Sequence, residues 1–315
     1  MRESMDNAKK VVVLGGTGFL GKHVMQRLAA QGHTAIALSR ANGTDLRDLG
    51  ALSAQLRTVQ PDVILNCAAH VGSLHYVTTF AAEVVSDNLL MLVNLYRAAQ
   101  ATAPNALIVN PISNCSYPGA ADIHTENEWE MGAVHDSVLA YGAPRRMIFA
   151  IAESYRKQYG TRSVNWLVSN AYGPGDHLDP NKVHALNGII IRLIQARRRG
   201  DQTFVLWGTG KPLREWVYIE DVAKMLVQSA ELATPQVRPV NLAQNKAWSI
   251  AEIAEMAAAT MQYPVQLVCD TSKPDGAPVK ILDDKLFRSQ WPEFAFTPLH
   301  SGIANTIAYY ENALD

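Results

Sequence analysis

Apolar and polar positions follow a regular order along the first half of the chain. Five short apolar runs have the length and composition of strands buried on both faces: 11–14, 34–38, 63–65, 106–109 and 164–168. Three longer stretches with apolar residues at helical spacing separate them: 19–30, 77–102 and 141–159. Strands that alternate with helices predict a doubly wound α/β fold of the Rossmann type, with a parallel sheet covered on both faces.

The alternation loosens after Asn170. Residues 171–176 predict a loop, and residues 183–199 predict a helix that ends in a basic cluster. Shorter segments follow, up to a final helix at 299–313. We therefore expect a dinucleotide-binding domain over residues 1–173, rejoined by residues 217–243, and a smaller substrate-binding lobe over residues 174–315.

Composition and charge narrow the class of protein. The chain has 315 residues, of which 48% are hydrophobic and 18% charged, enough to build a full core. Its 28 basic and 29 acidic residues give a net charge of −1, which argues against nucleic-acid binding by bulk electrostatics. No apolar run reaches the roughly 18–20 residues of a membrane span, and no signal-peptide pattern opens the chain, so we expect a cytoplasmic protein. The three cysteines are too scattered for a disulfide framework, and the histidines show no metal-ligand spacing.

A glycine-rich segment lies between the first predicted strand and the first predicted helix. Gly15, Gly18 and Gly21 allow a tight turn, close approach of the backbone to a pyrophosphate, and close packing of helix on strand. The helix N-terminus then faces the negative charge of the phosphates. The segment predicts a dinucleotide site, with further contacts from the other residues of the turn: Thr17, Phe19 and Leu20. A plain glycine-rich turn is the alternative.

The end of the second predicted strand bears on the choice of cofactor. An acidic residue there would bind a ribose hydroxyl, whereas Arg40 beside Ser39 favours a 2′-phosphate, and hence NADP(H) over NAD(H). An arginine that is merely solvated is the alternative. Softer predictions of cofactor contact fall on residues that follow the second and third strands: Asp45, Leu46, Ala68 and Ala69. Packing alone also explains the two alanines.

Several motifs together resemble the extended short-chain dehydrogenases/reductases of the NAD-dependent epimerase/dehydratase family, which act on nucleotide sugars. They are the glycine segment, Asn66-Cys67-Ala68-Ala69, Asn88, 113–118, Tyr141, 170–174, 179–184, 207–215 and 271–276. Within that family they are most similar to the GDP-L-fucose synthase branch, whose members are NADPH-dependent 3,5-epimerases and 4-reductases. The resemblance covers nearly the whole chain. It implies a GDP-linked 4-keto (6-deoxy) sugar as substrate and a cofactor contact from Asn88.

The reductase chemistry of this family uses a serine, a tyrosine and a lysine four residues after the tyrosine. Ser113 and Tyr141 match, but the third position holds Arg145. A tyrosine beside a cation can give its proton to the carbonyl oxygen as hydride arrives, and the spacing places both side chains on one helical face. Arginine keeps the charge but does not release a proton. Pro144 is expected in the first helical turn, and Arg146 competes for the role of the cation.

The resemblance assigns epimerisation to Cys115 and His184. Protons on carbons beside a ketone are acidic, so an acid and a base on opposite faces of the sugar can invert those carbons. Thiol and imidazole groups have ordinary pKa values near neutrality, which suits proton transfer in either direction. A buried, inert cysteine and a surface histidine are the alternatives.

The resemblance also implies a set of substrate contacts: Asn170, His184, Arg192, Trp207, Arg214, Lys273 and Asp275. An arginine fork such as Arg214 suits a pyrophosphate. A solvated helix face is the alternative for Arg192, and core packing is the alternative for Trp207.

The sequence thus predicts an NADP(H)-dependent epimerase/reductase of a nucleotide sugar. Two other hypotheses about the function stay open at this point. One is a 4-epimerase or dehydratase that retains NAD, and the other is a dinucleotide-binding sensor with impaired catalysis. Related enzymes pair through the helices around 80–97 and 147–159, so we expect a homodimer, with no nucleic-acid, membrane or metal partner.

Overall fold

The computed structural model describes residues 8–119, 123–232, 235–273 and 275–315. Its main sheet has six parallel strands in the order β2-β1-β3-β4-β5-β9. These strands are β1 (Lys10–Leu14), β2 (Thr34–Leu38), β3 (Val63–Asn66), β4 (Leu107–Ser113), β5 (Arg162–Val168) and β9 (Val240–Leu242). The doubly wound α/β prediction is confirmed, and β9 brings the chain back to the sheet from the second half.

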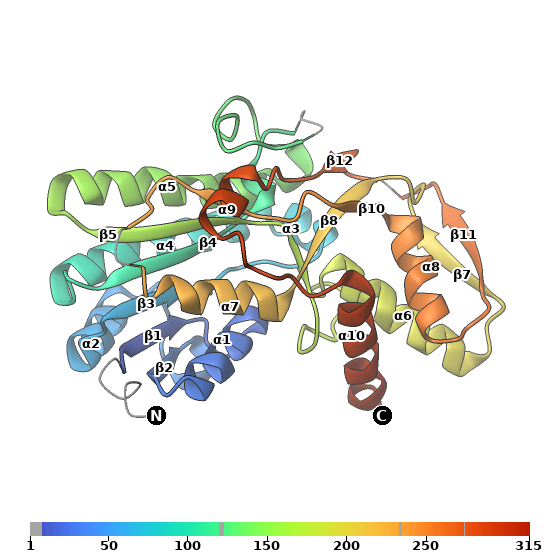
Figure 1. The fold of residues 1–315 in the computed structure, drawn as a ribbon, viewed down its shortest axis with the longest axis horizontal. Coiled ribbons are helices and arrows are strands. Elements are labelled where there is room, and N and C mark those ends of the chain that lie inside the picture. The colour runs from blue at the N-terminus through green and yellow to red at the C-terminus, as the bar shows by residue number, and fades with distance from the viewer. Residues whose placement is uncertain (1–7, 120–122, 233–234, 274) are drawn as a thin grey trace.

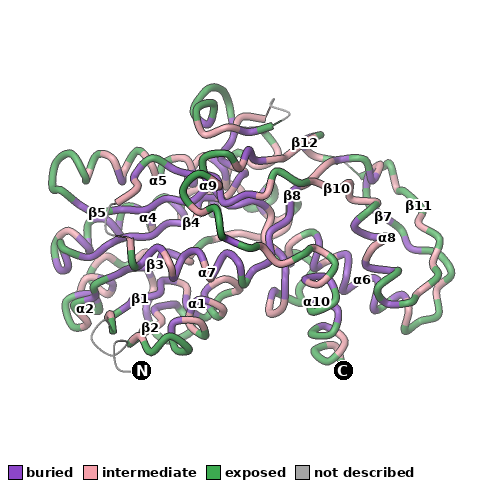
Figure 2. Tube along the Cα trace, viewed as in Figure 1, coloured by how far each residue is buried: buried purple, intermediate pink, exposed green. Residues whose placement is uncertain are grey.

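Helices cover both faces of this sheet (Figure 1). On one face, α1 (Phe19–Ala30) packs with α7 (Ile219–Ser229). On the other lie α2 (Leu49–Val59), α4 (Ala81–Thr102) and α5 (Leu139–Tyr159). Because successive strand side chains point to opposite faces, Val11 and Val13 enter one core while Val12 and Leu14 enter the other. The inner strands β1, β3, β4 and β5 are accordingly buried over most of their length (Figure 2).

Two helical predictions need correction. The stretch 77–102 is not one helix, because α3 (Leu74–Thr79) ends before α4 begins, and Phe80 between them has non-helical backbone angles (φ −106°, ψ 40°). Apolar spacing continues across this break, so periodicity does not register it. The second correction concerns α5, which starts at Leu139, so Pro144 lies beyond the first turn.

The second lobe surrounds β8 (Leu213–Tyr218). This strand pairs with β6 (Asn170–Tyr172) and β12 (Val279–Lys280) in parallel and with β10 (Ala247–Ser249) antiparallel. The predicted loop at 171–176 therefore begins within a short strand. A separate pair joins β7 (Thr203–Trp207) and β11 (Gln266–Asp270).

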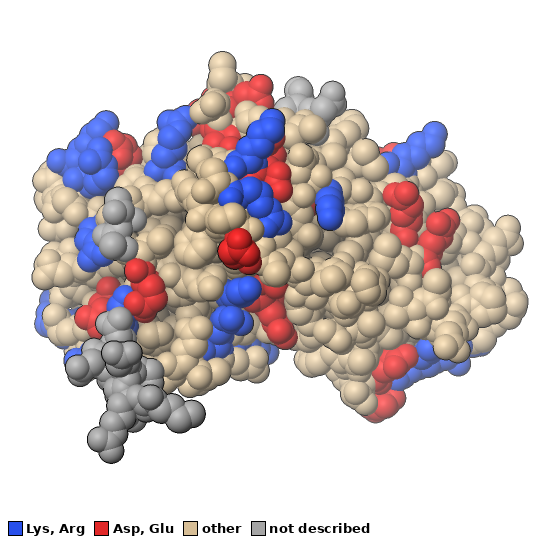
Figure 3. All heavy atoms as spheres, in the orientation of Figure 1, with Lys and Arg blue, Asp and Glu red and all other residues tan. Residues whose placement is uncertain are grey.

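Four helices complete the second half: α6 (Ala185–Arg199), α8 (Ile250–Thr260), α9 (Lys285–Gln290) and α10 (Leu299–Ala313). Three of them, α6, α8 and α10, bury their apolar faces together with residues of β7 and β8 in a third core. Basic and acidic side chains are interspersed on the face shown in Figure 3. Among the described residues, no helix is both long and apolar enough to cross a bilayer.

Candidate active site

The glycine-rich segment forms the turn between β1 and α1. Gly15 has a φ of +70°, and a side-chain carbon there would lie 2.8 Å from the Cα of Ala68 at the end of β3. Gly18 precedes α1, and Gly21 is buried in its first turn. The glycines thus let the turn pack backbone against backbone on the loop after β3 and on the first turn of α1, in front of the helix N-terminus. This arrangement fits the pyrophosphate of a dinucleotide.

The remaining residues of the turn have separate contacts. Thr17 shares a 2.9 Å hydrogen bond between its hydroxyl and that of Ser39, which joins the turn to the end of β2. Leu20 packs into the core beside α1. Phe19 opens α1, and its ring lies 5.5 Å from that of His184.

The polar side chains of the segment after β2 differ in their exposure and in their partners. Arg40 is exposed, whereas the carboxylate of Asp45 is held by Arg47 at 2.6 Å. This hydrogen bond lowers the pKa of Asp45 to about 2. Arg47 also bonds Asp87 of α4 at 3.1 Å, and Leu46 is a core residue. The predicted cofactor contacts of Asp45 and Leu46 stay predictions.

Asn88 anchors the loop that follows β3. Its side chain donates to the carbonyl of His70 at 2.8 Å and accepts from the His70 amide at 3.1 Å. The same oxygen accepts from Arg145. In that loop, Ala68 faces Gly15 and Ala69 is exposed. Asn88 thus connects Arg145 to the loop that lies beside the glycine turn.

Tyr141 and Arg145 lie next to each other on α5. The guanidinium carbon is 5.2 Å from the centre of the Tyr141 ring, and Arg145 is only 6% exposed. Burial raises the pKa of the Tyr141 phenol, and the positive charge of Arg145 opposes this increase. Arg146 instead donates to the carbonyls of Ser116 at 2.8 Å and Gly132 at 2.7 Å. The cation beside the phenol is therefore Arg145.

The end of β4 positions Cys115. Ser113 is the last residue of the strand, and its hydroxyl accepts from the Cys115 amide at 3.2 Å as the chain enters a short turn. The turn packs tightly on α5, where a side-chain carbon at Gly142 would lie 2.2 Å from the Cys115 carbonyl oxygen. This close approach holds the backbone of Cys115 beside Tyr141.

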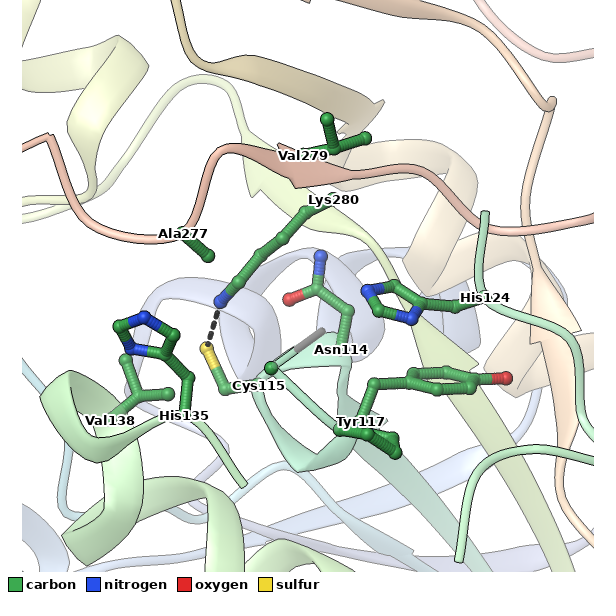
Figure 4. A pocket seen from close by; sticks show the side chains of 11 residues that line it. Asn114, Cys115, Tyr117, His124, His135, Val138, Ala277, Val279 and Lys280 are labelled. Atoms are coloured by element: carbon green, nitrogen blue, oxygen red, sulfur yellow. Dashed lines mark hydrogen bonds between the residues drawn. The ribbon is translucent and has the colours of Figure 1, made fainter. Parts of the chain in front are cut away.

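Lys280 of β12 reaches the same place from a distant part of the chain. Its Nζ lies 3.5 Å from the Sγ of Cys115 (Figure 4). The sequence analysis missed this residue. The available signal was a lysine between Val279 and Ile281, because a lysine in an apolar run needs a partner.

His184 belongs to another group of contacts. Its Nδ1 lies 3.0 Å from Asp176, whose fully buried carboxylate also accepts from the His184 amide and from Asn187. Burial lowers the pKa of His184, but the hydrogen bond and charge of Asp176 outweigh it and raise the pKa overall. Asp176 keeps a lowered pKa against its own burial through the same contacts. Sequence reasoning placed Asp176 only in a loop.

Direct contacts join some of the predicted catalytic residues in the structure. Tyr141 contacts Arg145, and Cys115 is held beside them with Ser113. Among the described residues, the recorded contacts of His184 run to Asp176 and Phe19, and none joins it to Cys115. The relation of these two side chains to one sugar ring stays a prediction.

The predicted substrate residues occupy the second lobe. Arg192 stacks between the rings of Phe204 and Trp207, at 4.7 and 4.8 Å, rather than on a solvated helix face. Trp207 is 59% exposed, so the core-packing alternative is wrong. The exposed ring of Trp207, at the end of β7, and the guanidinium of Arg192 together form a flat surface, which we call the shelf.

Arg214 and Asp275 meet through the loop before β12. Arg214 donates to the Leu213 carbonyl at 2.9 Å and to that of Asp275 at 3.4 Å. The carboxylate of Asp275 accepts from the amide and hydroxyl of Thr209, both at 2.7 Å, so it braces the loop after β7.

The last two predicted substrate residues differ in how firmly they are held. Asn170 donates to the Glu215 carbonyl at 2.7 Å, whereas Lys273 is exposed. Within the part of the chain that the structure describes, no group of three histidine, cysteine or acidic residues could hold a metal.

The chain is similar to known proteins over most of its length. The model of the NAD dependent epimerase/dehydratase family matches residues 11–243. The probable GDP-L-fucose synthase 1 of Oryza sativa subsp. japonica is 28% identical over 312 residues, covering 98% of this chain and 94% of the relative. The GDP-L-fucose synthase of Escherichia coli K12 is 27% identical over 312 residues, covering 96% of each chain.

The fold of this chain is also similar to that of solved structures. A GDP-L-fucose synthetase from Naegleria fowleri bound to NADP has a TM-score of 0.86 at 26% identity, covering 98% of this chain and 94% of that one. A GDP-6-OMe-4-keto-L-xylo-heptose reductase from Campylobacter jejuni has a TM-score of 0.87 at 19% identity, covering 99% of both chains. The second likeness concerns the fold alone.

Proposed function

This chain belongs to the NAD dependent epimerase/dehydratase family, and we propose that it is an NADP(H)-dependent epimerase/reductase of a GDP-linked 4-keto sugar. The enzyme class, an extended short-chain dehydrogenase/reductase of the nucleotide-sugar epimerase/reductase type, follows from the family and its curated relatives. The proposal adds the reaction, the cofactor and the substrate.

The observation that carries the proposal is the group of side chains at the end of β4. Tyr141 is half-buried beside the positive charge of Arg145, and the close approach at Gly142 holds Cys115 next to it. A bound dinucleotide supplies the hydride. The phenol of Tyr141 gives its proton to the sugar carbonyl oxygen, and Ser113 donates a hydrogen bond to that oxygen.

For epimerisation, we assign opposite proton-transfer roles to Cys115 and His184. A ketone makes the hydrogens on neighbouring carbons acidic, and two groups on opposite faces of the ring exchange them. The Asp176 carboxylate holds the His184 imidazole by its Nδ1, which leaves Nε2 as the nitrogen that exchanges a proton.

Two features support the choice of cofactor and of the nucleoside diphosphate that carries the sugar. Arg40 is exposed at the end of β2, where its charge suits the 2′-phosphate of NADP(H). The shelf of Arg192 and Trp207 offers a flat aromatic face and a cation to a base and its phosphates, and Arg214 lies on β8, the next strand along the chain. The names of the curated relatives favour guanine as the base.

The experiment follows NADPH oxidation and deuterium uptake from solvent with GDP-linked 4-keto sugars. We expect NADPH consumption and deuterium at the carbons beside the ketone. Absence of both with GDP-linked, UDP-linked and dTDP-linked 4-keto sugars would reject the proposal. Tightly retained NAD in the purified protein would favour a 4-epimerase or dehydratase, and cofactor binding without any turnover would favour a sensor.

We also propose a homodimer formed through α4 and α5. The two helices pack on each other, and their outer faces carry exposed apolar side chains: Leu89, Leu90, Val93 and Met147. Burying such a face against a second copy removes it from water. Sedimentation of the protein before and after charged substitution of Leu90 and Met147 tests this arrangement.

A further inference from the structure

A narrow pocket opens beside Cys115, between the turn after β4 and strand β12 (Figure 4). Polar side chains from four segments of the chain line it: Asn114, Cys115, His124, His135 and Lys280. It has room for one group of about the size of a hydroxyl or a water molecule.

The carboxamide of Asn114 has no hydrogen-bond partner for its nitrogen among the described residues. The residue is 2% exposed, so this donor has lost water without gaining a protein acceptor. A buried polar group left unpaired destabilises the folded state, so such groups in native proteins are usually satisfied by water or a ligand. The Asn114 nitrogen therefore indicates an oxygen-containing occupant of the pocket.

His124 forms the wall opposite Lys280. Its ring stacks on Tyr117 with centroids 4.6 Å apart, and the residue is 3% exposed, with no recorded partner for Nδ1 among the described residues. Burial, and then the positive charge of Lys280, lower the pKa of His124 to about 4. The imidazole is accordingly neutral at pH 7. It carries one donor and one acceptor, a combination that matches a hydroxyl group.

Lys280 completes the lining. One of its hydrogens points to the Cys115 sulfur, and the ammonium group carries two more. The pocket thus offers donors from Asn114 and Lys280 together with an amphoteric imidazole. A methyl group or a hydrogen atom of a ligand would leave these groups unpaired.

We propose that this pocket binds a hydroxyl group of the sugar, carried either on the carbon on which Cys115 acts or on the carbon next to it. This inference rests on the proposed function, because that function places the sugar against Cys115. The hydroxyl is that on C6 if Cys115 acts at C5, and that on C3 if it acts at C3. Asn114 and His124 are then specificity-determining residues for an oxygen substituent.

Two matched pairs of ligands test the inference in the intact protein loaded with NADP. GDP-D-mannose and GDP-D-rhamnose differ only by the C6 hydroxyl, and GDP-D-mannose and GDP-3-deoxy-D-mannose differ only by the C3 hydroxyl. We expect one pair to show a loss of affinity of about 10- to 100-fold for the deoxy ligand, measured by calorimetry. Equal affinities within both pairs would overturn the inference and leave the pocket to a water molecule.

Substitutions then assign the discrimination to the pocket. Asn114→Leu and His124→Phe remove the polar groups while keeping volume and, at position 124, the ring on Tyr117. Each is expected to shrink the affinity difference to less than threefold while affinity for GDP stays unchanged. Lys211→Met, on the exposed loop before β8, is the matched control and should keep the full difference.

The outcomes separate the inference from the function on which it rests. A variant that keeps the wild-type difference and the wild-type melting temperature would overturn the inference. If no GDP-hexose binds while NADP does, the proposed function fails together with it. If GDP-hexoses bind and turnover of 4-keto sugars is seen without discrimination, only the inference fails.

Discussion

The two proton-transfer centres that we propose, Tyr141 and His184, are built in different ways. Tyr141 has its charged partner on the same helix, four residues later, and the guanidinium lies over the phenol ring. His184 has its partner in the preceding loop, where the buried carboxylate of Asp176 bonds both the backbone and the ring of His184. The first pairing is a property of helical spacing. The second depends on how an irregular segment folds.

The balance between burial and the charged partner also differs between Tyr141 and His184. Burial favours the neutral form at both centres and raises the pKa of Tyr141, against which Arg145 acts only in part. At His184, Asp176 outweighs burial and raises the pKa of the imidazole. Each partner therefore favours the charged form, but only Asp176 prevails over desolvation.

Removing the phenol should have the largest effect. Tyr141→Phe deletes the proton donor and leaves the ring beneath Arg145, so we expect hydride transfer to fall about 10²- to 10⁴-fold. Single-turnover oxidation of NADPH measures the loss. Solvent deuterium exchange catalysed by Cys115 should persist, and a variant with undiminished NADPH oxidation would contradict the role of Tyr141.

Removing the cation should have an intermediate effect. In Arg145→Met nothing opposes the effect of burial on Tyr141, so its pKa should rise further and hydride transfer should fall by about 10- to 100-fold. Arg145→Lys keeps the charge and should recover most of the rate. The pH dependence of single-turnover NADPH oxidation distinguishes the two variants, and equal profiles would show that the charge is irrelevant.

Breaking the second centre should change epimerisation and its pH dependence. In Asp176→Asn the burial of His184 is no longer outweighed, so the pKa of the imidazole should fall below that of the native protein. NMR titration of the His184 ring measures this shift, and deuterium exchange at the sugar should slow by about 10-fold. Hydride transfer from NADPH, for which we propose Tyr141 as the proton donor, should be unchanged and serves as the internal control.

The same pair links stability to pH. Because the pKa of His184 is raised above its ordinary value of 6.5, its contribution to stability is complete below pH 6.5 and is lost as pH rises through the raised value. The lowered pKa of Asp176 contributes stability above pH 3.8 that is lost as pH falls through the folded-state value. Urea unfolding across this range should show both slopes in the native protein. In Asp176→Asn the acid slope should be absent and the His184 slope should reverse, because burial alone lowers the pKa of the imidazole.

Arg146 should matter least for activity. Its guanidinium clamps the carbonyls of Ser116 and Gly132, so Arg146→Ala is expected to lower stability by about 1–3 kcal/mol. Hydride transfer should stay within twofold of the native rate. A loss of activity as large as that of Arg145→Met, at unchanged stability, would reverse the assignment of the two arginines.

Much of the fold was predictable from local patterns. The predicted bounds of α1, β2 and α10 coincide with the observed ones, because their apolar spacing is continuous and ends at Gly, Pro or polar residues. The glycine turn and the Tyr141–Arg145 pair were also predictable, since both depend on residues within one turn or one helix. The break at Phe80 was not, because apolar spacing continues across it.

The sequence by itself determined the alternation of strands and helices, the glycine turn and the spacing of Tyr141 and Arg145, because short-range periodicity and glycine placement encode them. Only the tertiary structure decided that Lys280 reaches Cys115 across 165 residues, that Arg145 and not Arg146 faces the phenol, and that Asp176 holds His184. These contacts depend on how separate strands and loops pack. The pattern of apolar and polar residues along the chain does not predict which distant side chains this packing brings within hydrogen-bonding distance.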